Sequence, residues 1–385
     1  MIKILHFITD TNIGGAGNLL CQQIKGLEKG KFEFSVALPK GSALIHKLSP
    51  LPCKIIELQH GADRSFSLQS IIENYEIIRK VRPDIVPSHG SLSSRIAATI
   101  LKIPCRVFTR HCAPPIPKLM KNPLAKWIYG SVNNALSTSI IATAECARHF
   151  LISMGCDAQK IVTVVNGASP LRHLDYCEKA FLCARYGLDE KNFIVSILAR
   201  LEKGKGHKTL LEAAKICKKE CPNFRFFIVG TGSTEQYLRE LAQKLNVCDT
   251  VHFVGFQNDV ASILGITDVN VNCSYLSETS SLSLSEGMSI GVPCVASDVG
   301  GNPYMVKNEE NGLIFPSRNP RALADALIRL YRDNELYKKC SRGALERYRQ
   351  ELNSKTMCRK MTTFYLREYQ KSKNPTRITK IRSRG

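Results

Sequence analysis

The stretch that most constrains the fold of this chain runs from residue 268 to residue 295. It begins with a short run rich in β-branched residues, 268–273, which is typical of a buried strand. A polar turn follows, and apolar residues then recur at helical spacing until Gly291 ends the helix. Pro293 opens a second apolar run. A strand, a loop, a helix and another strand in this order predict one crossover of a parallel sheet.

Two carboxylates lie close to the start of this predicted helix. Glu278 falls in the loop before it, and Glu286 falls in about its second turn. Ser280 or Ser281 can cap the helix, and Leu282 begins its apolar face. The unpaired amides of a helix N-terminus bind anions, and an acid beside them can accept hydrogen bonds from sugar hydroxyls. The stretch therefore predicts a site for a sugar on a diphosphate. The simpler alternative is two solvated glutamates.

Composition bounds the number of domains and the kind of partner. The chain has 385 residues, more than one hydrophobic core usually serves, so two domains are expected. With 54 Lys plus Arg against 33 Asp plus Glu, the formal net charge is +21. This excess favours nucleic acid, an anionic membrane surface or phosphorylated small molecules as partners. General surface basicity is the alternative.

The cysteines and the apolar runs indicate a cytosolic protein. The 15 cysteines are scattered and form no C-x-x-C pair, which predicts reduced thiols and no zinc site. The N-terminal run 2–9 is a predicted strand and lacks the features of a signal peptide. No run approaches the ~20 apolar residues of a membrane span, so any membrane contact is expected to be peripheral.

A glycine-rich turn follows the first predicted strand. It contains Gly14 and Gly15 and precedes a helix predicted at about 19–27. Such a turn lets the backbone approach a phosphate or a sugar, and an ordinary tight turn is the alternative. Further strands are predicted at 34–38 and 53–58, and helices at 68–81 and 94–101.

Two later segments of the first half each end in a histidine. The segment 84–89 ends in His89, and a strand predicted at 106–111 ends in His111. A lone histidine is more often structural than functional. The segment 110–126 that follows is basic and rich in proline. It is either a patch for an acceptor or for anionic lipid head groups, or a plain surface loop.

The second half opens with a cationic turn. A strand at 192–199 ends at Arg200, and Lys205 stands just before a helix at 209–217. Arginine can chelate phosphate oxygens in a planar fork, and lysine adds a mobile point charge. For an isolated Arg and Lys, the alternative is a solvated surface. The preceding residues, 169–191, are predicted to be a linker and the entry to the second domain.

The carboxylate stretch resembles a known family. Glu278, Glu286 and the closing residues 291–293 are similar to the E-x7-E region of the retaining glycosyltransferases of family 4, which have the GT-B fold. Thr279 replaces the family's usual Gly, and Gly287 its usual Ala.

Other segments extend this resemblance. Arg200 and Lys205 fit the family's G-R-x-x-x-x-K-G, with Ala199 in place of the Gly. Tyr304 replaces the Glu of the family's G-G-x-x-E. Further matches are Gly14-Gly15 in the first loop, His111 in T-x-H, and Asn166 within 160–167.

The resemblance implies a fold and its domains. An α/β chain of two Rossmann-like, doubly wound domains facing a central cleft is expected. The acceptor-side domain is expected at 1–170 and the nucleotide-sugar domain at 171–351. A C-terminal helix at about 352–370 is expected to pack back on the first domain. Residues 371–385 are basic without an acid, which predicts a disordered tail.

The resemblance also implies a reaction and roles for residues. A sugar would move from a nucleotide-diphosphate donor to a glycan or lipid-linked acceptor, with retention at the anomeric carbon. Arg200 and Lys205 would clamp the diphosphate. Glu286 would hold the ribose, Glu278 would orient the donor sugar, and His111 would hydrogen-bond that sugar. The other substrate-binding residues implied are Gly14, Gly15, Ser280, Ser281, Leu282 and Asn166.

No metal and no cofactor besides the donor are expected, because no D-x-D motif occurs and basic residues can replace a divalent cation. The family and the charge favour an acceptor from cell-envelope, lipopolysaccharide or exopolysaccharide synthesis. This favours a location in the cytoplasm at the inner face of the plasma membrane.

Two alternatives stay open. One is a GT-B epimerase or phosphorylase, which would need no second sugar as acceptor. The other is a non-catalytic protein with a decayed site that binds membrane or nucleic acid, which Tyr304 favours. Nucleic acid is not expected, because no basic motif interleaved with aromatic residues occurs.

Overall fold

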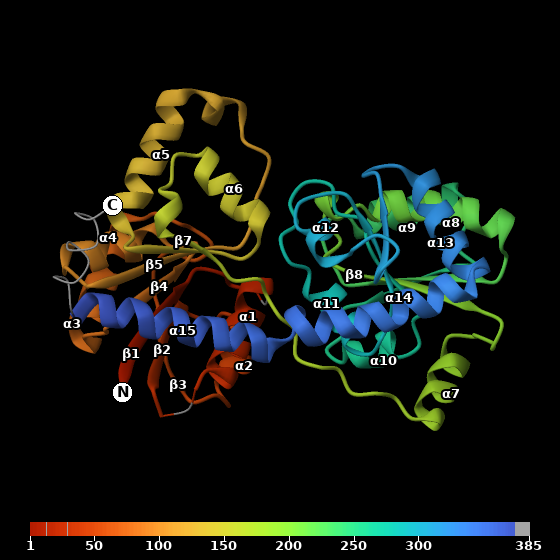
Figure 1. The fold of residues 1–385 in the computed structure, drawn as a ribbon, viewed down its shortest axis with the longest axis horizontal. Coiled ribbons are helices and arrows are strands. Elements are labelled where there is room, and N and C mark those ends of the chain that lie inside the picture. Colours follow the sequence, from red (N-terminus) through yellow and green to blue (C-terminus); the bar gives the residue numbers. More distant parts are fainter. Residues whose placement is uncertain (13, 29, 374–385) are drawn as a thin grey trace, which may run out of the picture. The chain divides into compact units, whose positions relative to one another are not determined.

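The computed structural model describes residues 1–12, 14–28 and 30–373 of the chain. It divides into two compact units (Figure 1). Unit 1 contains Met1–Asn166 together with the chain from Ser354 onward, and unit 2 contains Gly167–Asn353. Residues 374–385 of the predicted tail lie outside the described residues, while 371–373 are the end of a helix.

Unit 1 is built on a seven-stranded sheet in which every pairing is parallel, in the order β3-β2-β1-β4-β5-β6-β7. Its strands are β1 (Ile2–Ile8), β2 (Phe32–Pro39), β3 (Cys53–Leu58), β4 (Ile85–His89), β5 (Cys105–Arg110), β6 (Ser139–Ala142) and β7 (Ile161–Thr163). Its helices are α1 (Gly15–Gly26), α2 (Leu44–Leu48), α3 (Leu68–Val81), α4 (Leu92–Ile100), η1 (Lys118–Lys121), α5 (Pro123–Leu136), α6 (Glu145–Ser153), η2 (Ala158–Lys160) and α15 (Ser354–Lys373).

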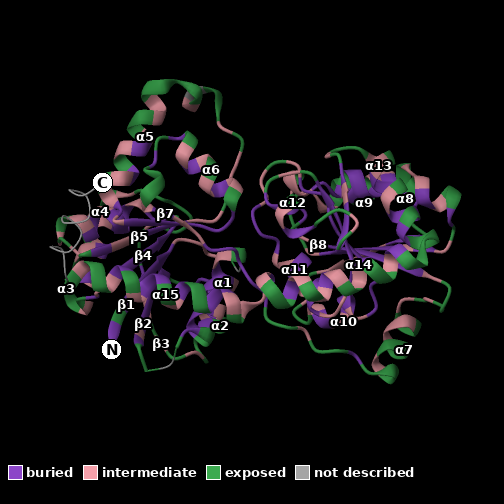
Figure 2. Cartoon of the chain, viewed as in Figure 1, coloured by how far each residue is buried: buried purple, intermediate pink, exposed green. Residues whose placement is uncertain are grey.

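Helices cover both faces of this sheet because successive side chains of a strand point to opposite sides. Ile4 and Ile8 of β1 belong to a core shared with α1 and α15. Leu5 and Phe7 of the same strand belong to a core shared with α3 and α4. Figure 2 shows the strands as buried elements between helices whose outer surfaces are exposed. Continuous apolar strands of this kind are typical of a parallel sheet covered on both faces.

The last helix, α15, completes the core of unit 1. Met357, Met361, Phe364 and Tyr365 are buried at helical spacing and pack in the same core as β1 and α1. Gly26 of α1 lets the two helices approach, since a Cβ there would lie 2.5 Å from Cys358 Sγ. Unit 1 is therefore assembled from two segments that are far apart in the sequence.

Unit 2 repeats this architecture with a six-stranded, all-parallel sheet in the order β10-β9-β8-β11-β12-β13. Its strands are β8 (Phe193–Leu198), β9 (Phe224–Val229), β10 (Val251–Gly255), β11 (Val269–Asn272), β12 (Cys294–Ser297) and β13 (Gly312–Phe315). Its helices are α7 (Tyr176–Arg185), η3 (Lys203–Lys205), α8 (His207–Glu220), α9 (Glu235–Lys244), α10 (Val260–Leu264), α11 (Leu282–Ser289), α12 (Asn302–Met305), α13 (Pro320–Arg332), α14 (Asn334–Arg347) and the π-helical turn η4 (Tyr348–Leu352).

The two faces of this sheet are also covered separately. Val195 of β8 packs in a core with α8, α9 and α13, and Ile194 packs in a core with α10 and residues of α7. The predicted pair of doubly wound, Rossmann-like α/β domains is confirmed.

Several predicted boundaries were wrong. The segment 169–191 is not only a linker, because it contains α7, which Asp175 and Glu178 start with a reciprocal capping box. The segment 110–126 is not all loop, because η1 and the start of α5 lie in it. Helix α1 begins at Gly15 rather than near residue 19.

The strand order places the polar loops of each unit. The chain changes direction across the sheet between β1 and β4 in unit 1, and between β8 and β11 in unit 2. In open α/β sheets, ligands bind outside the carboxyl ends of the strands at such a switch point. The loops after these four strands are therefore the places to look for function.

The packing of α15 predicts that this helix is essential to unit 1. Phe364 is 3% exposed in the shared core, so Phe364→Ala should lower the free energy of unfolding by about 3–5 kcal/mol. Urea unfolding followed by circular dichroism should show the transition of unit 1 at lower urea. Gln370→Ala, at an exposed position of the same helix, should change little. Equal effects of the two substitutions would contradict this packing.

Candidate functional site

The loop after β8 presents Arg200 to solvent. Gly230 and Gly232 of the neighbouring turn make room for this loop, since a Cβ at either position would lie within 2.4 Å of Ala199 O or Leu201 O. The side chain of Arg200 is exposed, and it forms no hydrogen bond or ion pair with any other residue that the structure describes. The fold thus fixes the backbone at Arg200 and leaves its guanidinium available.

Lys205 follows in a turn that is pinned beside β11. Gly206 has a φ of +76° and caps α8, and a Cβ at Gly206 would lie 2.0 Å from Cys273 O. The amide of Tyr275 donates to Gly204 O at 2.9 Å. Only glycine meets both demands of position 206, the left-handed backbone and the close approach. The turn therefore holds Lys205 next to the loop after β11.

Glu278 in that loop is the centre of a polar cluster. Its Oε2 lies 2.9 Å from Lys205 Nζ, and it accepts hydrogen bonds from Asn272 Nδ2 at 3.1 Å and Ser274 Oγ at 2.9 Å. The side chains of Lys205 and Glu278 are only 25% and 10% exposed.

The cluster keeps the Glu278 carboxyl ionised. Burial alone raises the pKa of Glu278, but the charge of Lys205 and the hydrogen bonds outweigh it and hold the pKa below its ordinary value. The sequence predicted Lys205 and Glu278 for this site, and it missed Asn272 and Ser274. The signal for them was two polar residues at the end of a strand.

A second glycine pair seats the loop of Glu278. A Cβ at Gly300 would lie 2.1 Å from Glu278 O, and one at Gly301 would lie 1.5 Å from Thr279 O. The amide of Gly301 donates to Glu278 O at 3.2 Å. Buried Asn302 then donates to Ser297 Oγ at 3.0 Å. The G-G motif is thus a packing requirement that fixes the backbone at Glu278.

Helix α11 begins directly after this loop. Ser281 is its N-cap and accepts from the Leu284 amide, as one of the two predicted cap residues. Ser280 and Ser281 are buried, and the amides of Leu282 and the next residue have no partner within a helix at these positions. Glu286 lies in the second turn of α11 and is partly buried.

Two departures from the family pattern have structural reasons. At Gly287, a Cβ would lie 2.9 Å from the Nδ2 of Asn270, which leaves little room for the usual Ala. The side chain of Tyr304 donates to the carboxylate of Glu351 and stacks under Arg347, with 4.8 Å from the guanidinium carbon to the ring centroid. Tyr304 therefore ties its loop to the end of α14 and the turn η4.

In unit 1, Gly14 and Gly15 lie at the N-terminus of α1. Gly14 is the N-cap, and Gly15 is the first helical residue. A Cβ at Gly15 would meet nothing within 4 Å, so packing in this unit does not require glycine there. Neither glycine brings a side chain to the N-terminus of α1, and a Cβ at Gly14 would lie 3.8 Å from Oδ2 of Asp10. Asn166, another predicted site residue, is buried at the end of unit 1.

His111 belongs to a chain of three imidazoles. His6 of β1, His89 of β4 and His111 after β5 stand side by side on adjacent strands. His6 Nδ1 lies 3.1 Å from His89 Nε2, and His89 Nδ1 lies 2.8 Å from His111 Nε2. The rings stack, with centroids 5.4 Å and 5.1 Å apart. The sequence predicted His111 and weighed His89, and it missed His6, whose signal is a polar residue within an apolar strand.

Burial keeps these histidines neutral. It lowers the pKa of His6 to about 3 and the pKa of His111 to about 4, with the charge of Arg110 adding to the effect at His111. For His89, burial and then its two histidine neighbours lower the pKa well below the ordinary value.

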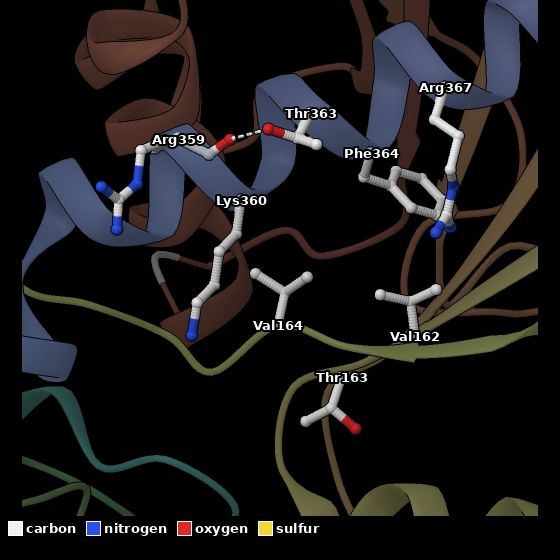
Figure 3. Close-up of a pocket in the computed structure, with 8 residues that line it drawn as sticks. All are labelled: Val162, Thr163, Val164, Arg359, Lys360, Thr363, Phe364 and Arg367. Carbon is white, nitrogen blue, oxygen red and sulfur yellow. Dashed lines mark hydrogen bonds between the residues drawn. The ribbon is translucent and has the colours of Figure 1, made fainter.

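A separate groove of about 280 Å³ lies in unit 1 between β7 and α15 (Figure 3). It is lined by Val162, Thr163, Val164, Arg359, Lys360, Thr363, Phe364 and Arg367. The guanidinium of Arg367 lies over the Phe364 ring, 5.7 Å from its centroid. The groove is apolar with a cationic rim, and none of the residues predicted for the site lines it.

Residues 1–12, 14–28 and 30–373 give no support for a metal site, a disulfide or a membrane-spanning helix. No group of three or more His, Cys, Asp or Glu side chains there is placed to hold a metal ion. All 15 cysteines are free thiols, as predicted. Every helix of this part of the chain is too short or too polar to cross a bilayer.

A cationic turn and a helix N-terminus at a switch point are features with which α/β proteins bind phosphorylated ligands. Comparison with known proteins is more specific. Residues 13–170 match the model of Glycosyltransferase Family 4, and residues 179–347 match that of Glycosyl transferases group 1. The two models together span most of the chain, which belongs to this glycosyltransferase family.

Relatives and solved structures agree with this assignment. The chain is 26% identical to the UDP-Gal:alpha-D-GlcNAc-diphosphoundecaprenol alpha-1,3-galactosyltransferase of Escherichia coli, over 87% of this chain and 89% of the relative. It is 28% identical to the N-acetyl-alpha-D-glucosaminyl L-malate synthase of Bacillus anthracis, over 78% of each chain.

In three dimensions, the chain resembles Anabaena HepE, solved in complex with UDP and glucose. The TM-score is 0.81 at 20% identity, with 95% of this chain and 99% of HepE covered. This likeness shows the GT-B fold, and the chain is a glycosyltransferase.

The buried pair predicts a large effect of removing its cation. Lys205→Met leaves the Glu278 carboxylate buried without its counter-ion, so unit 2 should lose about 3–5 kcal/mol of unfolding free energy at neutral pH. The loss should shrink as pH falls, because the pKa of Glu278 rises in the variant and the carboxyl can take a proton. Urea unfolding at several pH values measures both effects.

The matched control is Lys208→Met on α8. Lys208 lies 3.7 Å from Glu212, and the two side chains are 59% and 33% exposed, so this substitution should cost less than about 1 kcal/mol. Equal costs for Lys205→Met and Lys208→Met would contradict a buried, charged pair.

The histidine chain predicts that unit 1 loses stability in mild acid. The unfolded chain binds a proton at each histidine below about pH 6.5, whereas the folded chain does not until the pH nears the lowered pKa values, about 3 at His6 and about 4 at His111. Stability should therefore fall as pH falls from 6.5, by roughly 1.4 kcal/mol per pH unit for each histidine. Urea unfolding between pH 7 and 5 measures the slope.

One variant checks the source of this slope. His6→Phe removes one ring that stays neutral in the folded chain. The slope of the unfolding free energy against pH should therefore fall by the contribution of one histidine, roughly 1.4 kcal/mol per pH unit. A free energy that stays flat or rises between pH 7 and 5 would rule out neutral burial of the three rings.

Proposed function

We propose that this glycosyltransferase moves a sugar from a nucleotide-diphosphate donor to a glycan or lipid-linked acceptor, with retention at the anomeric carbon. The observation that carries the proposal is the cluster in unit 2, where the partly buried Lys205–Glu278 pair lies in the loops after β8 and β11. The available guanidinium of Arg200 stands in the first of these loops. Two cations at a switch point suit a diphosphate.

The chemistry of the leaving group gives these residues their roles. When the sugar departs, negative charge develops on the nucleoside diphosphate. Preorganised donors aimed at that charge stabilise it without reorganising during the reaction. Arg200, Lys205 and the first-turn amides of α11 are such donors. Glu278 orients the lysine and the donor sugar, because its own backbone is fixed by Gly300 and Gly301.

The remaining predicted residues complete the substrate sites. Glu286 holds the ribose hydroxyls, and Ser280, Ser281 and Leu282 supply the backbone at the diphosphate. In unit 1, His111 meets the donor sugar. Gly14, Gly15 and Asn166 bind substrate around the acceptor side. The proposed reaction uses no metal and no further cofactor, because Arg200 and Lys205 supply the positive charge.

The names of relatives guide the choice of substrates. A UDP-sugar is the first donor to test, since the E. coli relative is named for UDP-Gal and HepE was solved with UDP. That relative is also named for a diphosphoundecaprenol-linked acceptor, which supports an acceptor of cell-envelope, lipopolysaccharide or exopolysaccharide synthesis. No described contact favours the epimerase, phosphorylase or binding-protein alternatives.

A lipid-linked acceptor implies work at a membrane, and α5 offers a surface for peripheral contact. Leu124, Trp127, Ile128 and Val132 are exposed, and their spacing places them on one face of the helix. Figure 2 shows α5 with an exposed outer surface. Residues 85–144, which include α5, contain basic residues and no acidic residue. This supports contact with the anionic inner face of the plasma membrane, from the cytoplasm.

Arg200 provides the cleanest test of donor binding, because removing its exposed side chain breaks no contact within the described chain. Arg200→Ala should keep the thermal midpoint of the free protein and weaken UDP binding by about 10- to 100-fold, the value of one or two charge-assisted hydrogen bonds. In thermal unfolding with UDP, the wild type should gain up to about 2.7 kcal/mol at 100 times the Kd.

The control comes from the same turn. Lys203→Ala removes another exposed cation and should leave UDP binding unchanged. If UDP, GDP and ADP all fail to stabilise the folded wild type, or if both variants lose binding equally, the proposed clamp is wrong.

The membrane surface can be tested with the only tryptophan of the chain, Trp127. Vesicles with anionic lipid should shift its fluorescence to the blue, and the shift should weaken with salt and with Ile128→Glu. Phe181→Glu, at a residue 68% exposed in unit 2, should leave the shift unchanged. Absence of a shift with anionic vesicles would contradict contact through α5.

A further inference from the structure

The three imidazoles of unit 1 form a chain that can hold only two arrangements of protons. Each N···N contact between neutral rings needs one hydrogen, donated from one side. Either His6 and His89 donate through Nδ1 toward His111, whose own proton is then on Nδ1, or His111 and His89 donate through Nε2 toward His6, whose own proton is then on Nε2. Which nitrogen of a histidine carries the proton is set by the hydrogen bond that the other nitrogen makes. The three tautomers are therefore coupled.

The buried end of the chain decides between the two arrangements. His6 is fully buried, and its Nε2 has no hydrogen-bond partner among the described residues. The neighbouring rings of Phe34 and Tyr365 lie 6.2 Å and 6.4 Å away between centroids and offer it no acceptor atom in hydrogen-bond contact. An orphaned buried N–H is rarer than an acceptor without its donor. A bare Nε2 on His6 is therefore the better arrangement.

The direction of the chain follows from this end. With Nε2 bare, His6 carries its proton on Nδ1 and donates to His89 Nε2 across 3.1 Å. His89 is then protonated on Nδ1 and donates to His111 Nε2 across 2.8 Å. His111 must then carry its own proton on Nδ1.

We propose that His89 is a positioning residue that, anchored by His6, holds His111 in the Nδ1–H tautomer and fixes the plane of its ring. Any group that meets Nδ1 of His111 then meets a hydrogen-bond donor. Such a nitrogen selects an oxygen acceptor, such as a sugar hydroxyl or a phosphate oxygen. Only this last step rests on the proposed function, since the tautomer is a property of the free protein.

The test is nuclear magnetic resonance of the full chain labelled with ¹⁵N in histidine, without any ligand. In the wild type, His6, His89 and His111 should each show a protonated Nδ1 and a bare Nε2. Coupling across the hydrogen bond should connect His89 Nδ1 with His111 Nε2. If His111 carries its proton on Nε2 or populates both tautomers, the proposal is overturned.

Two variants separate positioning from a structural role. His89→Phe removes the donor, so His111 should populate both tautomers. His89→Asn places an amide where Nδ1 stood, so the Nδ1–H tautomer of His111 should be restored. His252→Phe, at a histidine stacked on Phe227 in unit 2, is the control and should leave the His111 signals unchanged. An unchanged His111 in His89→Phe would also overturn the proposal, and the wild-type spectrum decides it if that variant does not fold.

Discussion

The partly buried ion pair between Lys205 and Glu278 is the interaction around which the polar site of unit 2 is arranged. A carboxylate that is 10% exposed needs a cation and hydrogen-bond donors close to it, and the strand ends of β8 and β11 bring them together. The glycines around the pair serve this purpose. Gly206 and Gly301 allow backbones to approach where any side chain would collide. The same geometry leaves Arg200 outside the pair and available to a ligand.

Unit 1 also buries polar side chains at its switch point, but these side chains are neutral. His6, His89 and His111 are polar side chains on three adjacent strands, and each satisfies its neighbour. Charging one ring would break the pattern, so the chain is compatible with burial only while neutral. The two units therefore share a fold and differ in how their polar sites are stabilised. Charge is balanced by charge in unit 2, and a directed hydrogen-bond chain removes the need for charge in unit 1.

Much of this could be predicted from the sequence, because local signals and tertiary structure agree there. The apolar strands, the cap at Ser281 and the motif around Glu278 are local patterns. What escaped prediction depends on contacts between distant segments. The role of His6 needs three strands side by side, which no local pattern shows. The return of the C-terminal helix to the first domain was predicted only through the family resemblance, and its packing in the core of unit 1 confirms it. Helix α7 was missed although its capping box was present in the sequence.

The central claim is that the loops after β8 and β11 bind a nucleoside diphosphate. Hydrogen–deuterium exchange of the full chain with and without UDP tests it most directly, because it locates the ligand without a substitution. The account predicts slower exchange in residues 199–207 and 278–290 when UDP is bound. Protection confined to the groove between β7 and α15, or protection in neither loop at saturating UDP, GDP and ADP, would contradict it.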